Sequence, residues 1–103
     1  MKPLTAYIIV ATIITMIIDF DAAKSAKNLV ERELPFDSVI DFDWQSASVA
    51  VDSRNAYPEQ RLVAFGYLNE RLHVLCFTPI AGGIRVISLR RANKREVSRY
   101  ENP

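Results

Sequence analysis

The chain has 103 residues, of which half are hydrophobic and 24% are charged, a composition that excludes a disordered segment and fits one small globular domain. It contains one cysteine, Cys76, and one histidine, His73, which excludes an internal disulfide, a thiolate metal cluster and a two-histidine acid–base pair. The net charge of +1 indicates no partner, but residues 85–103 contain six Lys and Arg against two Glu. This basic segment indicates either a polyanionic or acidic partner, or only a solvated helix face.

The start of the chain is dominated by an apolar run from Tyr7 to Ile18. The run is too short for a transmembrane helix, which needs about 20 apolar residues. Three interpretations are open: Met16 is the natural start and residues 1–15 are an upstream addition, the run is a secretion signal, or it forms an edge strand or an oligomer contact. We favour the first, so that the domain comprises residues 16–103 and residues 1–15 are an apolar extension outside its core.

Two helices are predicted after a short apolar strand over Met16–Asp19. Asp21 can cap a helix that ends near Glu33, because its side chain can accept hydrogen bonds from the free N–H groups of the first turn. Pro35 suits the first turn of a second, short helix over residues 36–42. The residues at helical spacing that would give the first helix an apolar face are Ala22, Ala26, Leu29 and Val30.

The hydropathy period then changes to two, which is typical of half-buried strands. The predicted strands are residues 47–51, 61–67, 71–78 and 84–89. Residues 68–70 and 79–83 are the predicted turns, with Gly82 and Gly83 supplying positive φ angles in the second. Residues 92–100 predict a last helix. The fold class is therefore α+β, with N-terminal helices followed by an antiparallel β-meander and a C-terminal helix.

Arginine side chains are predicted to gather at one edge of this sheet. Alternate strands of a meander run in the same direction, so Arg61 and Arg85 should lie at one edge, about 10 Å apart. Arg90 would lie at the opposite end of the last strand and begin the helix side of a groove. The residues expected beside Arg61 and Arg85 are Arg54, Tyr57 and Glu59 from the preceding loop and Tyr100 from the end of the last helix.

The chemistry of these residues suits phosphate. A guanidinium group donates two parallel hydrogen bonds to phosphate oxygens, and a cluster of such groups can stabilise the charge that grows on a pentavalent phosphorane. Glu96 or Tyr100 could move protons. The alternative is that the arginines form ordinary surface ion pairs, and His73 and Cys76 are expected to be packing or surface residues on opposite faces of a strand.

Three stretches of the chain carry a pattern shared with a known family. They are Ile18-Asp19-Phe20-Asp21-x-x-Lys24-x-x-x-Asn28, Asp52-x-Arg54-x-x-Tyr57-x-Glu59-x-Arg61 and Ile84-Arg85-Val86-Ile87-Ser88-Leu89-Arg90-Arg91-Ala92-Asn93-x-Arg95-Glu96-x-x-x-Tyr100. Together they resemble the BrnT family of toxins over residues 16–101. Where that family commonly has Lys-His-Gly after the first stretch, this chain has Glu31-Arg32-Glu33, which argues against a histidine-based mechanism.

The resemblance implies a RelE-like fold and a cytoplasmic ribonuclease that halts translation, with RNA as substrate and no cofactor, metal or membrane partner. It also implies a BrnA-type antitoxin and a toxin homodimer within a complex that binds promoter DNA through the antitoxin. The catalytic residues that it implies are Arg61, Arg85, Arg90 and Glu96, to which the geometry above adds Tyr100. The further residues expected to bind RNA are Arg54, Tyr57, Arg91 and Arg95.

Three functional hypotheses follow from these observations. The first is a metal-independent endoribonuclease, in which a ribose 2′-hydroxyl attacks the adjacent phosphate. The second is a catalytically degenerate toxin fold that only binds an antitoxin or nucleic acid, which the missing histidine motivates. The third is a small exported or membrane-tethered protein, which the apolar run at Tyr7–Ile18 motivates.

Overall fold

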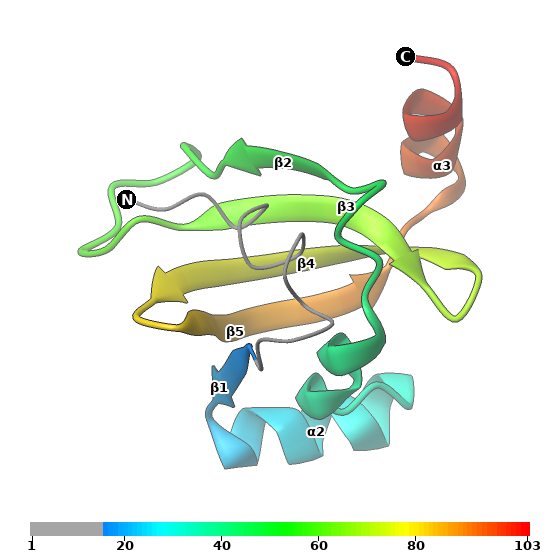
Figure 1. Cartoon of the computed structure of the whole chain (residues 1–103). Helices are drawn as coiled ribbons and strands as arrows, with labels where there is room; N and C mark the ends of the chain where they lie inside the picture. The colour runs from blue at the N-terminus through cyan, green and yellow to red at the C-terminus, as the bar shows by residue number, and fades with distance from the viewer. Residues whose placement is uncertain (1–15) are drawn as a thin grey trace.

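The computed structural model describes residues 16–103, and the extension expected over residues 1–15 lies outside the described part. The elements are, in chain order, β1 (Ile17–Phe20), α2 (Ala22–Arg32), the 3-10 helix η1 (Phe36–Asp41), β2 (Ser48–Val51), β3 (Leu62–Leu68), β4 (Arg71–Ile80), β5 (Gly83–Arg91) and α3 (Lys94–Glu101). The fold is α+β, as predicted. Figure 1 shows α2 and η1 side by side near β1, with α3 apart from them beyond the end of β5.

The strands form one mixed sheet in the order β1-β5-β4-β3-β2. Strands β2 to β5 form the predicted antiparallel meander. The strand predicted near Met16 is also confirmed as β1, but it pairs in parallel with β5, with Ile17 beside Gly83 and Phe20 beside Val86. A purely antiparallel sheet preceded only by helices is therefore wrong. The physical reason is that β5 would otherwise be an edge strand with unpaired backbone groups, which β1 satisfies.

The two glycines of the β4–β5 turn have different roles. Gly82 has φ 79°, the left-handed conformation that a tight turn requires. Gly83 does not share this positive φ, so the prediction that both glycines supply one is wrong for Gly83. A Cβ atom at Gly83 would lie 1.9 Å from the carbonyl oxygen of Ile17, so only glycine lets β1 approach β5 this closely.

The main core lies between one face of the sheet and residues 34–44, which include η1. Phe77 and Leu75 of β4 are fully buried at its centre. Trp44 packs edge-on against both Phe77 and Phe42, with ring centroids 5.3 and 4.8 Å apart. The other buried members of this core are Leu34, Phe36, Val39, Leu62, Ala64, Leu68, Ile84, Val86 and Leu89.

The buried face of α2 is polar, which corrects the predicted apolar face. Leu29 is 49% exposed and Val30 is 83% exposed, whereas Ser25 and Asn28 are buried. Asn28 Nδ2 donates to the carbonyl oxygens of Leu34 at 2.7 Å and Leu89 at 3.0 Å, so it joins the helix to β5. The buried carbonyl oxygens of Leu34 and Leu89 need hydrogen-bond donors. A polar side chain on α2 can supply such a donor, and an apolar side chain cannot.

Helix α3 begins two residues later than predicted and lies across the opposite face of the sheet. Asn93 caps it, since its side chain accepts from Glu96 N at 2.8 Å while Glu96 Oε1 accepts from Asn93 N at 2.9 Å. Val97 and Tyr100 pack against a second, smaller apolar cluster around Leu72 and Val74. The helix therefore covers only one end of this face and leaves the rest open.

Candidate functional site

The open face of the sheet carries both ends of the arginine-rich β5 strand. Cross-strand partners share one face, and the register places Arg85 beside Thr78 and Arg90 beside Val74. A β-bulge in β5, opposite the step from Cys76 to Phe77, shifts this register. Without the bulge, an odd separation along the strand would put the two arginines on opposite faces. The bulge therefore brings Arg85 and Arg90 to the same side.

A pocket of about 380 Å³ opens on this face below the first turn of α3, and we call it the arginine pocket. It brings Arg54 and Arg90 together, although the predicted topology placed them at opposite ends of the sheet. The cause is that the Arg54 side chain is held over the sheet rather than out at its edge. The residues that line the pocket are Val51, Asp52, Ser53, Arg54, Val63, Phe65, Val74, Cys76, Ser88, Arg90 and Glu96.

Asp52 is the anchor that holds Arg54 in place. Arg54 Nε and Nη2 each donate to a different carboxylate oxygen of Asp52 at 2.8 Å, and Arg54 N donates to the same carboxylate at 3.2 Å. Tyr57 Oη adds a bond at 3.3 Å. The Asp52 side chain is only 1% exposed. The hydrogen bonds from Arg54 hold the pKa of Asp52 far below its ordinary value, so this carboxylate stays charged.

Arg90 is held in the same way from the start of α3. Its Nη1 and Nη2 atoms donate to the two carboxylate oxygens of Glu96, each at 2.8 Å. These bonds, above all other causes, lower the pKa of Glu96 to about 2. At neutral pH such a carboxylate holds no proton to donate and is a weak base. This argues against the predicted role of Glu96 in proton transfer and for a role in holding Arg90.

Arg61 and Arg85 lie at the other end of the open face, as predicted. Arg85 Nε donates to Asp19 of β1 at 2.9 Å, and its Nη1 lies 3.8 Å from Glu59. The guanidinium of Arg61 stacks on the ring of Tyr57, 4.2 Å from its centroid. Within residues 16–103, Arg61 has no carboxylate partner, and its buried Nε atom has no hydrogen-bond partner. Arg61 therefore keeps an uncompensated positive charge beside the loop.

Three predicted site residues do not join this group. Tyr100 lies at the opposite end of β3 from Arg61, where its ring packs edge-on against Tyr67 and its hydroxyl donates to the carbonyl oxygen of Ser46. The prediction that α3 returns Tyr100 to the Arg61 edge is wrong, because α3 crosses the strands at their far end. Arg91 donates to the carbonyl oxygen of Arg32, the last residue of α2, at 2.9 Å. The side chain of Arg91 therefore lies on the core side of the sheet, away from the open face. Arg95 is exposed on α3.

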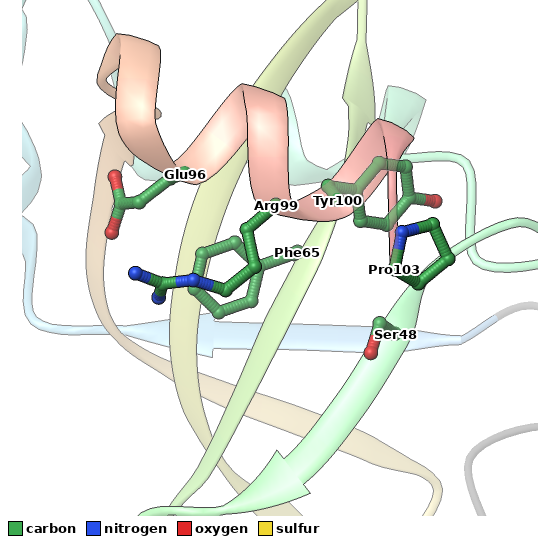
Figure 2. Close-up of a pocket in the computed structure, with 6 residues that line it drawn as sticks. All are labelled: Ser48, Phe65, Glu96, Arg99, Tyr100 and Pro103. Carbon is green, nitrogen blue, oxygen red and sulfur yellow. The ribbon is translucent and has the colours of Figure 1, made fainter.

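A second pocket, of about 390 Å³, lies under α3 and was missed by sequence reasoning. We call it the aromatic pocket. Figure 2 shows Glu96, Arg99 and Tyr100 coming from the helix above it, with Phe65 and Ser48 on the strands below. Phe65 and Glu96 line both pockets, so the two are neighbours on the same face. Phe65 looked like an ordinary strand residue because only the position of α3 turns it into a pocket wall.

The single histidine and cysteine are packed residues. His73 is 3% exposed, and its Nδ1 lies 2.7 Å from the carbonyl oxygen of Arg71. Burial lowers the pKa of His73 and raises the pKa of Cys76, so both favour their neutral forms. In the part of the chain that the structure describes, no three His, Cys, Asp or Glu side chains are grouped to hold a metal ion, and no helix is both long and apolar enough to cross a membrane.

Comparison with known proteins gives a match to a protein family. No curated protein and no solved structure matches the chain significantly. Residues 20–96 match a family described as the ribonuclease toxin BrnT of type II toxin–antitoxin systems. The match runs from the end of β1 into α3 and covers both ends of the open face, from Arg61 to Arg90. Because it spans well over half of the chain, the protein belongs to the BrnT family of ribonuclease toxins.

Proposed function

We propose that this chain is a RelE-like endoribonuclease that cleaves RNA without a metal ion. In this reaction a ribose 2′-hydroxyl attacks the adjacent phosphate, and the 5′-oxygen of the next nucleotide leaves. The observation that carries the proposal is the gathering of guanidinium groups from separate elements on one open sheet face. Arg54 and Arg90 line one pocket there, and Arg61 and Arg85 lie at its loop end.

The arginines divide into two kinds. Arg54 and Arg90 are each fixed by a two-bond fork to a carboxylate, which uses part of their hydrogen-bonding capacity and leaves further N–H groups for a phosphate. Arg61 stacks on Tyr57 and carries no carboxylate among the described residues. We therefore assign Arg61 the main attraction for the scissile phosphate. Arg85, at the same end of the face, is assigned the charge that develops on the phosphorane, and Arg90, at the other end, is assigned contact with a neighbouring phosphate.

Proton transfer needs a different account from the one that the sequence indicated. Glu96 has a pKa of about 2, and Tyr100 is engaged with Ser46 away from the arginines. We propose that electrostatic stabilisation by the guanidinium groups supplies most of the rate enhancement. Water then takes the proton from the 2′-hydroxyl and returns one to the leaving oxygen. Removing one well-placed donor from such a site typically lowers kcat by about 100-fold.

The family description names a toxin–antitoxin system, which supports an antitoxin as a partner. We propose that the toxin acts in the cytoplasm by stopping translation and that a BrnA-type antitoxin neutralises it. The complex would contain a toxin homodimer and bind promoter DNA through the antitoxin. Exposed apolar side chains support a protein partner, since Val30 of α2 is 83% exposed and Ile40 of η1 is 76% exposed.

The test is cleavage of a 5′-labelled RNA by the purified full chain in excess EDTA. We expect products that end in a 2′,3′-cyclic phosphate, and we expect no cleavage of a DNA strand of the same sequence. The double variant Arg85→Ala/Arg90→Ala should cleave at least 100-fold more slowly. Lys27→Gln, an exposed substitution on α2, serves as the control. Equal cleavage by the double variant and the control would show that the assignment of the arginines is wrong.

A degenerate binding module is the second candidate, and one observation favours it. Arg54, Arg85 and Arg90 each have their own carboxylate, as in ordinary surface ion pairs. A module of this kind would bind an antitoxin or RNA without cutting it. Induced expression in cells without an antitoxin gene separates the candidates, because growth arrest supports the enzyme and unimpaired growth supports the module.

A further inference from the structure

The aromatic pocket has the composition of a base-binding site. The aromatic rings of Phe65 and Tyr100 line it, and Arg99 adds a guanidinium group. Every nucleobase has an apolar π-face that stacks on aromatic rings and on guanidinium planes. The pocket volume of about 390 Å³ accommodates such a ring system. Nothing in the reaction proposed above uses Phe65 or Arg99.

The position of this pocket relative to the arginines suits a single nucleotide. Phe65 lies beside Val74, and Val74 lies beside Arg90, so Phe65 and Arg90 are two strands apart on the same face. Two strand spacings are about 10 Å. Glu96 lines both pockets, so no element separates them. A nucleotide whose phosphate contacts Arg90 can therefore place its base against Phe65.

The roof of the pocket is fixed before any ligand arrives. Tyr100 packs on Tyr67 with ring centroids 5.7 Å apart and donates to the carbonyl oxygen of Ser46. The capping box of Asn93 and Glu96 holds the first turn of α3. A preformed aromatic slot loses little entropy when a flat ring enters it.

We infer that the aromatic pocket binds one unpaired base of the RNA substrate, next to the phosphate held by Arg90, with Phe65 as its stacking platform. This inference rests on the proposed function for the identity of the ligand. It makes Phe65, Arg99 and Tyr100 substrate-positioning residues rather than catalytic residues. Because stacking needs only a π-face, the pocket selects unpaired RNA over duplex RNA and reads its sequence weakly.

The experiment measures binding without cleavage. A fluorescent, fully 2′-O-methylated eight-nucleotide RNA lacks the attacking hydroxyl, so anisotropy with the full chain gives a Kd. We expect Phe65→Leu to raise Kd about tenfold, whereas Phe65→Tyr keeps the ring and the wild-type value. Arg99→Gln should weaken binding, and Lys94→Gln, which removes one charge from the same helix outside the pocket, is its matched control.

A second measurement varies the RNA and compares the wild type with Phe65→Leu. One abasic nucleotide is moved along the 2′-O-methyl strand, and we expect one position at which the wild-type Kd rises about tenfold but the Phe65→Leu Kd does not rise further. A flat abasic scan, equal binding by Phe65→Leu and wild type, or no binding at all would overturn the inference. Base-dependent binding by a chain that cleaves no RNA would instead sustain the inference and refute the proposed endoribonuclease.

Discussion

Asp52 and Arg54 form a closed fork at the rim of the open sheet face, with both carboxylate oxygens of the buried aspartate engaged by the arginine at 2.8 Å. The same carboxylate also accepts from Tyr57, on whose ring Arg61 stacks. One buried side chain therefore positions two guanidinium groups, one directly and one through an aromatic ring. Asp52 is thus a positioning residue for the proposed RNA site.

The first prediction concerns this carboxylate. Asp52→Asn keeps the size of the side chain but replaces one acceptor oxygen by an N–H donor that faces the guanidinium of Arg54. We expect kcat/KM for RNA to fall roughly 10- to 100-fold, because misplacement of binding groups is costly even when they remain present. Steady-state cleavage of the labelled RNA measures this effect.

Asp43→Asn is the matched control for this variant. Asp43 also accepts from a backbone N–H two residues on, Gln45 N at 3.2 Å, but it lies outside both pockets. Its replacement should leave kcat/KM unchanged. If Asp52→Asn retains the wild-type kcat/KM while circular dichroism shows an intact fold, the positioning role is refuted.

The second prediction is a dependence of stability on pH. The pKa of Glu96 lies at about 2 in the folded chain, against an ordinary value of 4.5, mainly because Arg90 donates to it. A group whose pKa is lowered by folding stabilises the folded state above its unfolded pKa, and this contribution is lost as the pH falls through the folded value. Stability should therefore decline between about pH 4.5 and pH 2.

Glu96→Gln isolates this contribution. The variant should be less stable than the wild type by about 1 kcal/mol at pH 7, and the difference should vanish toward pH 2. Urea unfolding at a series of pH values measures both free energies. A difference that stays constant from pH 7 to pH 2 would mean that the ion pair with Arg90 does not form in solution.

The sequence predicted local structure well, and its errors concern long-range placement. Alternation identified the strands of the meander, and Asp21 was correctly identified as a helix cap, since its side chain accepts from Ala23 and Lys24. The parallel partner of β1 could not be predicted, because a four-residue apolar strand carries no signal for its neighbour. The polar buried face of α2 was missed, because Ser25 and Asn28 are selected by distant backbone groups and not by hydropathy.

The candidate site was predicted in part. Arg61 and Arg85 lie at one end of the sheet, as the meander indicated, but the bulge in β5 that brings Arg90 to the same face has no sequence signature. Tyr100 was misplaced because a helix predicted from periodicity has no predicted direction. The sequence does contain one signal for the role of Glu96: Asn93 and Glu96 have capping-box spacing, which marks Glu96 as a structural carboxylate at a helix start.

The third prediction concerns the end of α2. Glu33 adopts the left-handed conformation, with φ 57° and ψ 32°, at the position where helices commonly have glycine. Glu33→Gly removes this strain and should stabilise the chain by about 1 kcal/mol, which raises Tm by about 4–8 °C in a domain of this size. The RNA cleavage rate should not change. Glu31→Gly, inside the same helix, should instead destabilise by about 1 kcal/mol, and stabilisation by both changes would refute this account.

The last prediction concerns the pairing of β1 with β5 and its effect on Arg85. Gly83→Ala would place a Cβ atom 1.9 Å from the carbonyl oxygen of Ile17, and no side-chain rotation can relieve a clash with backbone. We expect β1 to separate from β5 and the chain to lose about 3 kcal/mol. Because β1 carries Asp19, Arg85 then loses its carboxylate at 2.9 Å.

The detachment of β1 can be measured directly. Amide hydrogen exchange of Ile17, whose N–H donates to Gly82 at 2.9 Å, reports the detachment of β1. Gly82→Ala is the control, because its Cβ would meet only the flexible end of Ile17 at 3.2 Å and its cost comes mainly from the positive φ. If Gly83→Ala leaves the exchange of Ile17 as slow as in the wild type, β1 stays attached and the clash argument is refuted. Fast exchange of Ile17 already in the wild type would mean that β1 does not pair with β5 in solution, and that Asp19 is not the group that holds Arg85.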